Sequence, residues 1–172
     1  MPEASHTTFS IVNLSPDHWP GVRAIYAEGV NGGLATVISQ LPTWKDFDQS
    51  KRPDLRLAAV DDASHVLGWA TCEPFSHHPA YAGVVEDSVY VAEAAQRRGI
   101  GRALLQALVD RAAACGVWTI QSKIFSLNHA SIDLHVRLGF RLVGVYERLG
   151  APSCGPYRGK RLDVTLLQRS IQ

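Results

Sequence analysis

The sequence predicts one α/β (α+β) domain that spans residues 1–172 and is built around a mixed sheet. The first observation is length, because 172 residues fit one compact domain better than two. The second is composition, since 46% hydrophobic and 19% charged residues are typical of a globular chain. The third is periodicity: strand-like and helix-like segments follow one another in the order β-α-α-β-β-β-α-β-α-β-β.

The N-terminal part is expected to begin with a strand and a helix. Residues 9–14 alternate in polarity, as a short strand does. A helix is predicted from Ser15, Pro16 and Asp17, which supply a capping hydroxyl, a proline for the first turn and an acid at the positive end of the dipole. We expect this helix to end near Glu28, because three glycines follow it closely.

A short helix and three strands are predicted next. The helix covers 44–52 and ends before a proline. The segments 55–60 and 66–72 are rich in apolar residues and are joined by the turn-forming residues 61–64, so they are expected to form a hairpin. The third strand is predicted over 83–91.

The second half is expected to contribute two helices and three strands. Apolar side chains recur at helical spacing from Ile100 to Ala112, which predicts a long amphipathic helix ending at about residue 115. The remaining elements are predicted as a strand over 117–125, a helix over 128–138 that ends at a glycine, and strands over 140–148 and 162–168.

Charge, hydropathy and cysteine usage exclude several classes of protein. The formal net charge is only +1, so no nucleic-acid partner is expected. No stretch reaches the roughly 18 apolar residues that a spanning helix needs, so no membrane partner is expected. Three distant cysteines without a CxxC pair, together with an N-terminus that lacks a signal-peptide pattern, predict a cytoplasmic protein.

No metal site is predicted. His77 and His78 are adjacent, so their side chains point apart, and no third ligand lies at a suitable spacing. Cys154 lies in a loop with glycine and proline, and no histidine is placed by the sequence to activate it. We expect Cys154 to be a free thiol.

The segment between the third strand and the long helix is the strongest functional signal. Its glycines, Gly99 and Gly101, let the backbone approach a ligand closely. The amides of residues 97–102 would lie at the helix start, where unpaired N–H groups and the dipole favour a phosphate or diphosphate. The alternative is a helix start that only requires small residues. The GxGxxG dinucleotide pattern and a Walker lysine are both absent, which argues against NAD and ATP.

Two sequence blocks resemble the GNAT acetyltransferase superfamily. The family's Q/R-x-x-G-x-G/A motif is matched in full by Gln96, Arg97, Arg98, Gly99, Ile100 and Gly101. The residues Asn128-His129-Ala130-Ser131, followed by the segment 134–140, resemble a block of phosphinothricin and methionine-sulfoximine acetyltransferases. The resemblance continues in order through nearly the whole chain. It implies a mostly antiparallel sheet, flanked by helices and splayed at a site for acetyl-CoA.

The resemblance also implies which residues hold the co-substrate. Besides the motif residues and Arg102, they are the backbone of Val89, Tyr90 and Val91 and the side chains of Asn128 and Ser131. An amide near Val89 or Tyr90 would polarise the thioester carbonyl, as an oxyanion hole does. Asn128 is expected to bind the pantetheine arm, to cap its helix, or to do both.

Glu86 and His135 are the predicted catalytic residues. Glu86 stands where the subfamily carries the base that takes the ammonium proton, and strand alternation places Asp87 on the opposite face. The alternative for Glu86 is an exposed strand residue in a surface ion pair. His135 could protonate the leaving thiolate. Its alternative is a histidine packed beside Phe140 with both nitrogens satisfied.

The acceptor is expected to be the amine of a small amino acid or analogue, such as phosphinothricin, methionine sulfoximine or methionine sulfone. Val37 and Arg161 depart from the family pattern, and the loop 150–157 looks longer than usual. These departures leave open another amine: a polyamine, an aminoglycoside or a protein N-terminus. A non-catalytic acyl-CoA-binding module is the third alternative. Relatives in the family are often homodimers, so a homodimer is expected.

Overall fold

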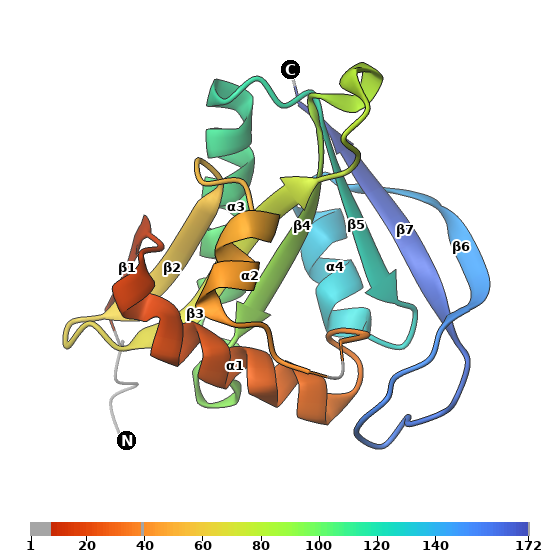
Figure 1. Cartoon of the computed structure of the whole chain (residues 1–172), viewed down its shortest axis with the longest axis horizontal. Helices are drawn as coiled ribbons and strands as arrows, with labels where there is room; N and C mark the ends of the chain where they lie inside the picture. The colour runs from red at the N-terminus through yellow and green to blue at the C-terminus, as the bar shows by residue number, and fades with distance from the viewer. Residues whose placement is uncertain (1–7, 39, 172) are drawn as a thin grey trace.

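A mixed sheet crosses the whole molecule (Figure 1). The computed structural model describes residues 8–38 and 40–171. Its seven strands lie in the order β1-β2-β3-β4-β5-β7-β6. The strands are β1 (Phe9–Asn13), β2 (Arg56–Asp61), β3 (Val66–Pro74), β4 (Val84–Val91), β5 (Thr119–Phe125), β6 (Arg141–Gly150) and β7 (Leu162–Ser170). Neighbouring strands are antiparallel except β4 and β5, which confirms the predicted mixed, mostly antiparallel sheet.

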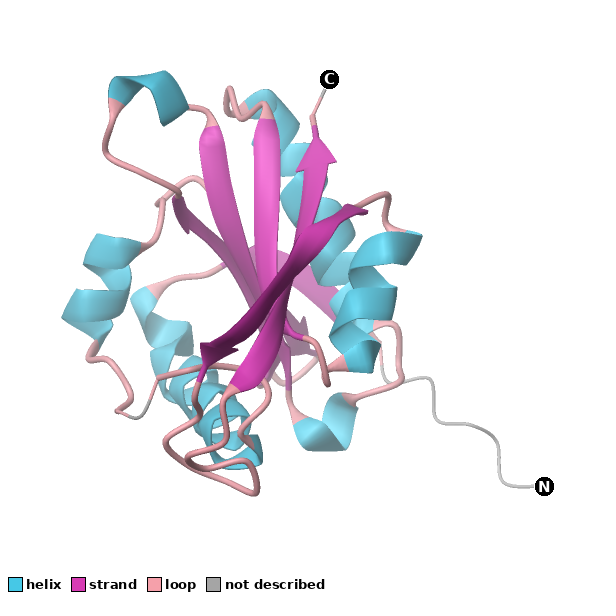
Figure 2. Cartoon of the chain, turned by 90° about the vertical axis from the view of Figure 1, so that its right-hand side faces the viewer, coloured by secondary structure: helices cyan, strands magenta, loops and turns pink. Residues whose placement is uncertain are grey.

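Helices cover both faces of this twisted sheet (Figure 2). The α-helices are α1 (Trp19–Gly32), α2 (Trp44–Ser50), α3 (Ile100–Ala114) and α4 (His129–Arg137). Short 3-10 turns cover Pro16–His18, Pro79–Tyr81 and Glu93–Ala95. No helix in the described part of the chain is long and apolar enough to cross a membrane.

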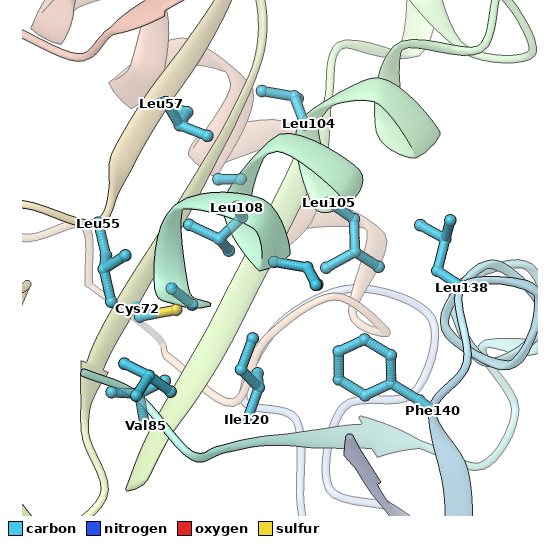
Figure 3. Packing of buried hydrophobic residues seen from close by; sticks show 14 of the residues in the cluster. Leu55, Leu57, Cys72, Val85, Leu104, Leu105, Leu108, Ile120, Leu138 and Phe140 are labelled. Carbon is cyan, nitrogen blue, oxygen red and sulfur yellow. The ribbon is translucent and has the colours of Figure 1, made fainter. Parts of the chain in front are cut away.

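Two hydrophobic clusters hold the helices against the sheet. On one face, α3 presents Leu104, Leu105 and Leu108 to the strands, and all three are completely buried (Figure 3). On the other face, α1 and α2 pack on Trp69 of β3, which contacts Phe47 of α2. Each fully buried side chain of this size stabilises the fold by roughly 1.5–3 kcal/mol. The two clusters therefore fix the strands on which the site is built.

The first helix differs from its prediction at both ends. Residues 16–18 form a 3-10 turn, and α1 continues past Glu28 to Gly32. Gly29 lies inside the helix, and a glycine is needed there because a Cβ atom would approach the Tyr90 ring to 2.8 Å. Of the three glycines expected to end the helix, only Gly33, with φ of 75°, adopts the left-handed conformation typical of a helix end. The glycine at 29 therefore serves tertiary packing rather than helix termination.

Candidate active site

The sheet opens between β4 and β5. These parallel strands pair only from Val84 to Glu86 on β4, and beyond Glu86 they diverge (Figure 1). The Ala92 amide donates to the Leu67 carbonyl of β3 at 2.9 Å. Because amide directions alternate along a strand, the Tyr90 amide also faces β3, whereas the Val89 amide faces the opening. Of the two amides predicted to polarise a carbonyl, the geometry leaves that of Val89 available.

One cavity, of about 250 Å³, follows the exposed edge of β4 toward α3. Its wall contains Val89, Tyr90, Val91, Gln96 and Asn128, all predicted site residues. The Tyr90 hydroxyl donates to the Ala35 carbonyl at 2.9 Å, and its ring stacks on Trp69. The Tyr90 side chain thus anchors the loop that forms the opposite wall.

The start of α3 is open to a ligand. Gly99 is the N-cap, with φ of 80°, and no side chain of the described residues caps the helix. A Cβ atom on Gly99 would meet no atom of another described segment within 4 Å. The side chains of Arg97, Arg98 and Arg102 are exposed, and Arg98 donates to the Ala94 carbonyl. Uncapped amides at a helix start beside arginines fit a diphosphate group. Ile100 is buried, so only its backbone can serve such a group.

A second cavity, of about 510 Å³, joins the first at the opening of the sheet, since Leu34, Ala35, Val89, Tyr90 and Asn128 line both. Its other lining residues include the predicted Glu86, Ser131 and His135. The geometry therefore brings together the predicted catalytic residues and the predicted binding residues of α4. Some of the positions that depart from the family pattern lie here as well. Val37 and Gly150 line this cavity, whereas Arg161 does not.

Glu86 lies at the last paired position before the strands diverge, with its side chain at the second cavity. Its carboxylate accepts a hydrogen bond from the Lys123 ammonium at 2.7 Å. The structure thus combines the two interpretations of the sequence, because Glu86 faces a cavity and also forms an ion pair. Its role as the base stays a prediction.

His135 is buried and held at both ring nitrogens. Nδ1 lies 2.7 Å from the Ser131 carbonyl oxygen, and Nε2 lies 2.9 Å from the Asp87 carboxylate. The ring also packs edge-on against Phe140. Burial favours the neutral imidazole, but the charge and hydrogen bond of Asp87, with the Ser131 carbonyl, raise the pKa of His135 above its usual value. These contacts are those of the packed, satisfied histidine; proton donation to a thiolate stays a prediction.

Asn128 is the N-cap of α4, and Ser131 lies in its first turn. The Asn128 side-chain oxygen accepts from the Ser131 amide at 3.2 Å, which confirms the capping role. The Asn128 amide group lies 3.4 Å from the Leu34 carbonyl across the opening. Asn128 therefore joins α4 to the loop after α1, at the junction of the two cavities.

Several polar residues of the second cavity were not singled out from the sequence. Asp87 is buried and also accepts a hydrogen bond from the Ser122 hydroxyl of β5. Lys123 of β5 pairs with Glu86, and Lys51 pairs with Glu73 of β3 at 2.6 Å. Strand alternation had placed Asp87 opposite Glu86, but its partners on β5 and α4 depend on the spatial arrangement of distant segments.

Comparison with known proteins points to the same class of enzyme as the geometry of the site does. Residues 22–140 match the family described as "Acetyltransferase (GNAT) family". An L-methionine sulfoximine/L-methionine sulfone acetyltransferase of Pseudomonas paraeruginosa is 36% identical over 160 residues, which cover 88% of each chain. A phosphinothricin N-acetyltransferase of Streptomyces coelicolor is 44% identical over 117 residues, covering 68% of this chain and 66% of the relative.

A solved structure supports the same relationship. A GNAT superfamily phosphinothricin acetyltransferase from Sinorhizobium meliloti, in complex with AcCoA, superimposes with a TM-score of 0.84 and 30% sequence identity. The alignment covers 95% of this chain and 89% of that chain.

Proposed function

The chain belongs to the acetyltransferase (GNAT) family, and on this premise we propose how its residues carry out acetyl transfer and which acceptor they serve. It is an acetyl-CoA-dependent N-acetyltransferase. Its acceptor is the amine of a small amino acid or analogue, of the kind named for its relatives: methionine sulfoximine, methionine sulfone and phosphinothricin. We treat residues 1–172 as one acetyltransferase domain. The observation that carries the proposal is Glu86 at the cavity where β4 leaves β5.

The co-substrate site is assigned to the opening of the sheet and the start of α3. The amides at Gly99 to Arg102 would hold the diphosphate, and the β4 backbone at Val89 and Val91 would face the pantetheine arm. A Cβ atom on Gly101 would make ordinary contacts with Leu134 and Val91, at 3.4 and 3.5 Å, so the helix start has room for an alanine at this position. When bound there, acetyl-CoA supplies an activated acetyl thioester.

The acceptor side is assigned to the second cavity. Glu86 would take the proton of the acceptor ammonium, directly or through water, so that the amine nitrogen can attack the acetyl carbonyl carbon. The Val89 amide would donate to the carbonyl oxygen as negative charge develops on it, and loss of such a donor typically costs about 2.7–4 kcal/mol. The C–S bond then breaks. Of the two protons that the acceptor nitrogen loses overall, one leaves to solvent by way of Glu86, and the other is balanced by protonation of the CoA thiolate. His135 is the proposed proton donor to that thiolate, and solvent restores its proton.

The test follows CoA release from acetyl-CoA over a panel of amines, with wild type and Glu86→Gln. We expect turnover with methionine sulfone and phosphinothricin and none with polyamines, aminoglycosides or peptides. Loss of a general base typically lowers the rate about 10²–10⁴-fold, so Glu86→Gln should lose this factor in kcat while binding acetyl-CoA normally. Turnover only with polyamines, aminoglycosides or peptides would contradict the acceptor assignment, and tight acetyl-CoA binding with no turnover would contradict the enzyme.

We also propose that the chain forms a homodimer through β6. This edge strand exposes Leu142 by 60%, Val145 by 51% and Leu149 by 58%, and a strip of this kind is typical of a protein interface. Light scattering should give twice the chain mass for wild type and the single mass for Leu142→Glu. Val136→Glu is the control, because Val136 is equally exposed on α4. A monomeric wild type would refute the dimer.

A cytoplasmic location is proposed from the cysteines. Cys72, Cys115 and Cys154 are all free thiols, as expected in a reducing compartment. Fractionation of cells that express the chain would test this, and recovery outside the cytoplasm would contradict it.

A further inference from the structure

Four charged side chains form a row across the floor of the second cavity. Glu73 of β3 and Glu86 of β4 are directly paired across the two strands. Each carboxylate holds one lysine: Lys51 at 2.6 Å from Glu73, and Lys123 at 2.7 Å from Glu86. All four line the same cavity. The order across the sheet is therefore cation, anion, anion, cation.

Electrostatics explains this order. The Cβ atoms of residues directly opposite each other on antiparallel strands lie about 4.5–5.5 Å apart, and like charges at such paired positions destabilise the sheet. Each lysine offsets the repulsion by neutralising one glutamate. If one lysine leaves its glutamate, the site attracts another cation to the same position. An ammonium group fulfils that requirement.

The two lysines differ in their freedom to leave. The Lys51 side chain is only 10% exposed, and its backbone carbonyl accepts a hydrogen bond from Arg56. The Lys123 side chain is 39% exposed, and its ammonium reaches Glu86 from β5 across the opening of the sheet. A partly exposed lysine can keep its methylene groups against the protein while its ammonium group moves into solvent. Of the two lysines, the more exposed Lys123 is therefore the one that can leave its glutamate more easily.

We propose that Lys123 binds the α-carboxylate of the acceptor after the acceptor's ammonium has taken its place beside Glu86. This inference rests on the proposed function and names the specificity residue of the same site. A free amino acid carries both an ammonium and a carboxylate group. When it binds, the Lys123–Glu86 ion pair is replaced by two, one between the ammonium and Glu86 and one between the carboxylate and Lys123. A simple amine would occupy Glu86 and leave Lys123 without an anion.

Other cations are less well placed for this role. Among the described residues that line the cavity, the remaining positive groups are Lys51 and His135. Lys51 stays with Glu73, and both nitrogens of His135 are occupied by Asp87 and a backbone carbonyl. The basic residues of the 148–161 segment do not line the cavity. Lys123 is thus the cation on the cavity wall that an acceptor can free.

The experiment compares a free acid with its amide. The acceptors are L-methionine sulfone and its α-carboxamide, and the variants are Lys123→Met, Lys123→Arg and Lys45→Met. Lys45 is the matched control because it is an exposed lysine of α2 that lines neither cavity. We expect Lys123→Met to lower kcat/KM for the acid about ten- to hundredfold, mainly through KM, since a hydrogen bond to a charged group is lost. The amide should react with all variants alike, and Lys123→Arg should restore much of the activity with the acid.

Two results would overturn the inference and leave the acetyltransferase intact. One is equal kcat/KM of wild type for acid and amide. The other is a parallel loss for both acceptors in Lys123→Met, which would mean that Lys123 only positions Glu86. An acetyl-CoA affinity equal to that of wild type, measured by calorimetry, shows that each variant is folded. If Lys123→Met does not bind acetyl-CoA in this way, Lys123→Gln is used in its place. If wild type binds acetyl-CoA but acetylates neither acceptor, the proposed acceptor class fails as well.

Discussion

The buried ion pair between Asp87 and His135 permits a quantitative prediction for Asp87→Asn. The two side chains are 1% and 4% exposed, and their nearest atoms are 2.9 Å apart. Breaking a buried pair by altering one partner typically costs about 3–5 kcal/mol, because the other charge stays buried without compensation. We therefore expect Asp87→Asn to lower the free energy of unfolding by about this amount near pH 6.

The loss of unfolding free energy in Asp87→Asn should decrease as pH rises. The pKa of His135 is raised in the folded state, so its contribution to stability is complete below the unfolded value of about 6.5 and is lost as pH rises through the folded pKa. In Asp87→Asn a neutral His135 can accept a hydrogen bond from the new amide, whereas a charged one cannot. The difference between wild type and variant should therefore shrink above about pH 6.5, by up to about 1.4 kcal/mol per pH unit.

The assay is urea unfolding followed by circular dichroism at several pH values. Asp61→Asn is a matched control, because His65 also pairs with Asp61, at 3.1 Å, but the His65 side chain is 77% exposed. This control should change stability little at any pH, because exposed pairs contribute little. A penalty for Asp87→Asn that equals the control, or that stays constant or grows with pH, would refute the reasoning.

Substitutions at three further positions test the site and the packing around it. Gly101→Glu should abolish calorimetric acetyl-CoA binding, because it places bulk and negative charge beside the diphosphate position. Gly101→Ala should bind normally, because its Cβ would make ordinary contacts of 3.4 and 3.5 Å with Leu134 and Val91. Gly68→Ala should destabilise the fold in thermal unfolding by about 1–3 kcal/mol, since its Cβ would lie 2.8 Å from a backbone oxygen of β4. Thr71→Val should leave stability unchanged or raise it by up to about 1 kcal/mol, because the buried Thr71 hydroxyl has no partner among the described residues. A normal affinity for Gly101→Glu, an unchanged Gly68→Ala or a marked loss for Thr71→Val would each contradict its argument.

Local sequence patterns were sufficient for most of the elements. The long helix α3, of fifteen residues, was predicted to within about a residue because its apolar side chains repeat from Ile100 to Ala112 and a glycine precedes it. The end of α1 was predicted wrongly, because Gly29 resembles a helix stop in the sequence but packs against Tyr90 in the structure. A distant contact of this kind leaves no periodic signal.

The site also has some features that the sequence could predict and others that only the structure shows. That Glu86 and His135 lie at one cavity could be expected, because each belongs to a block that resembles a known family. The pairing of Glu86 with Glu73 depends on the register between β3 and β4, and the reach of Lys123 depends on the divergence of β4 from β5. Neither register nor divergence can be derived from residue types alone. The proposed specificity residue therefore became visible only in three dimensions.

Strand β6 links the outer edge of the sheet to the acceptor cavity. Leu149 and Gly150 form part of the cavity wall, while Leu142 and Val145 of the same strand face outward. Because one strand, paired with β7, carries both sets of residues, a substitution that shifts β6 at the outer edge should also shift the cavity wall. Substitutions on the exposed side of β6 can therefore change the preferred acceptor even when every cavity-lining residue is kept. A search for variants with new acceptors should accordingly randomise this rim as well as the interior.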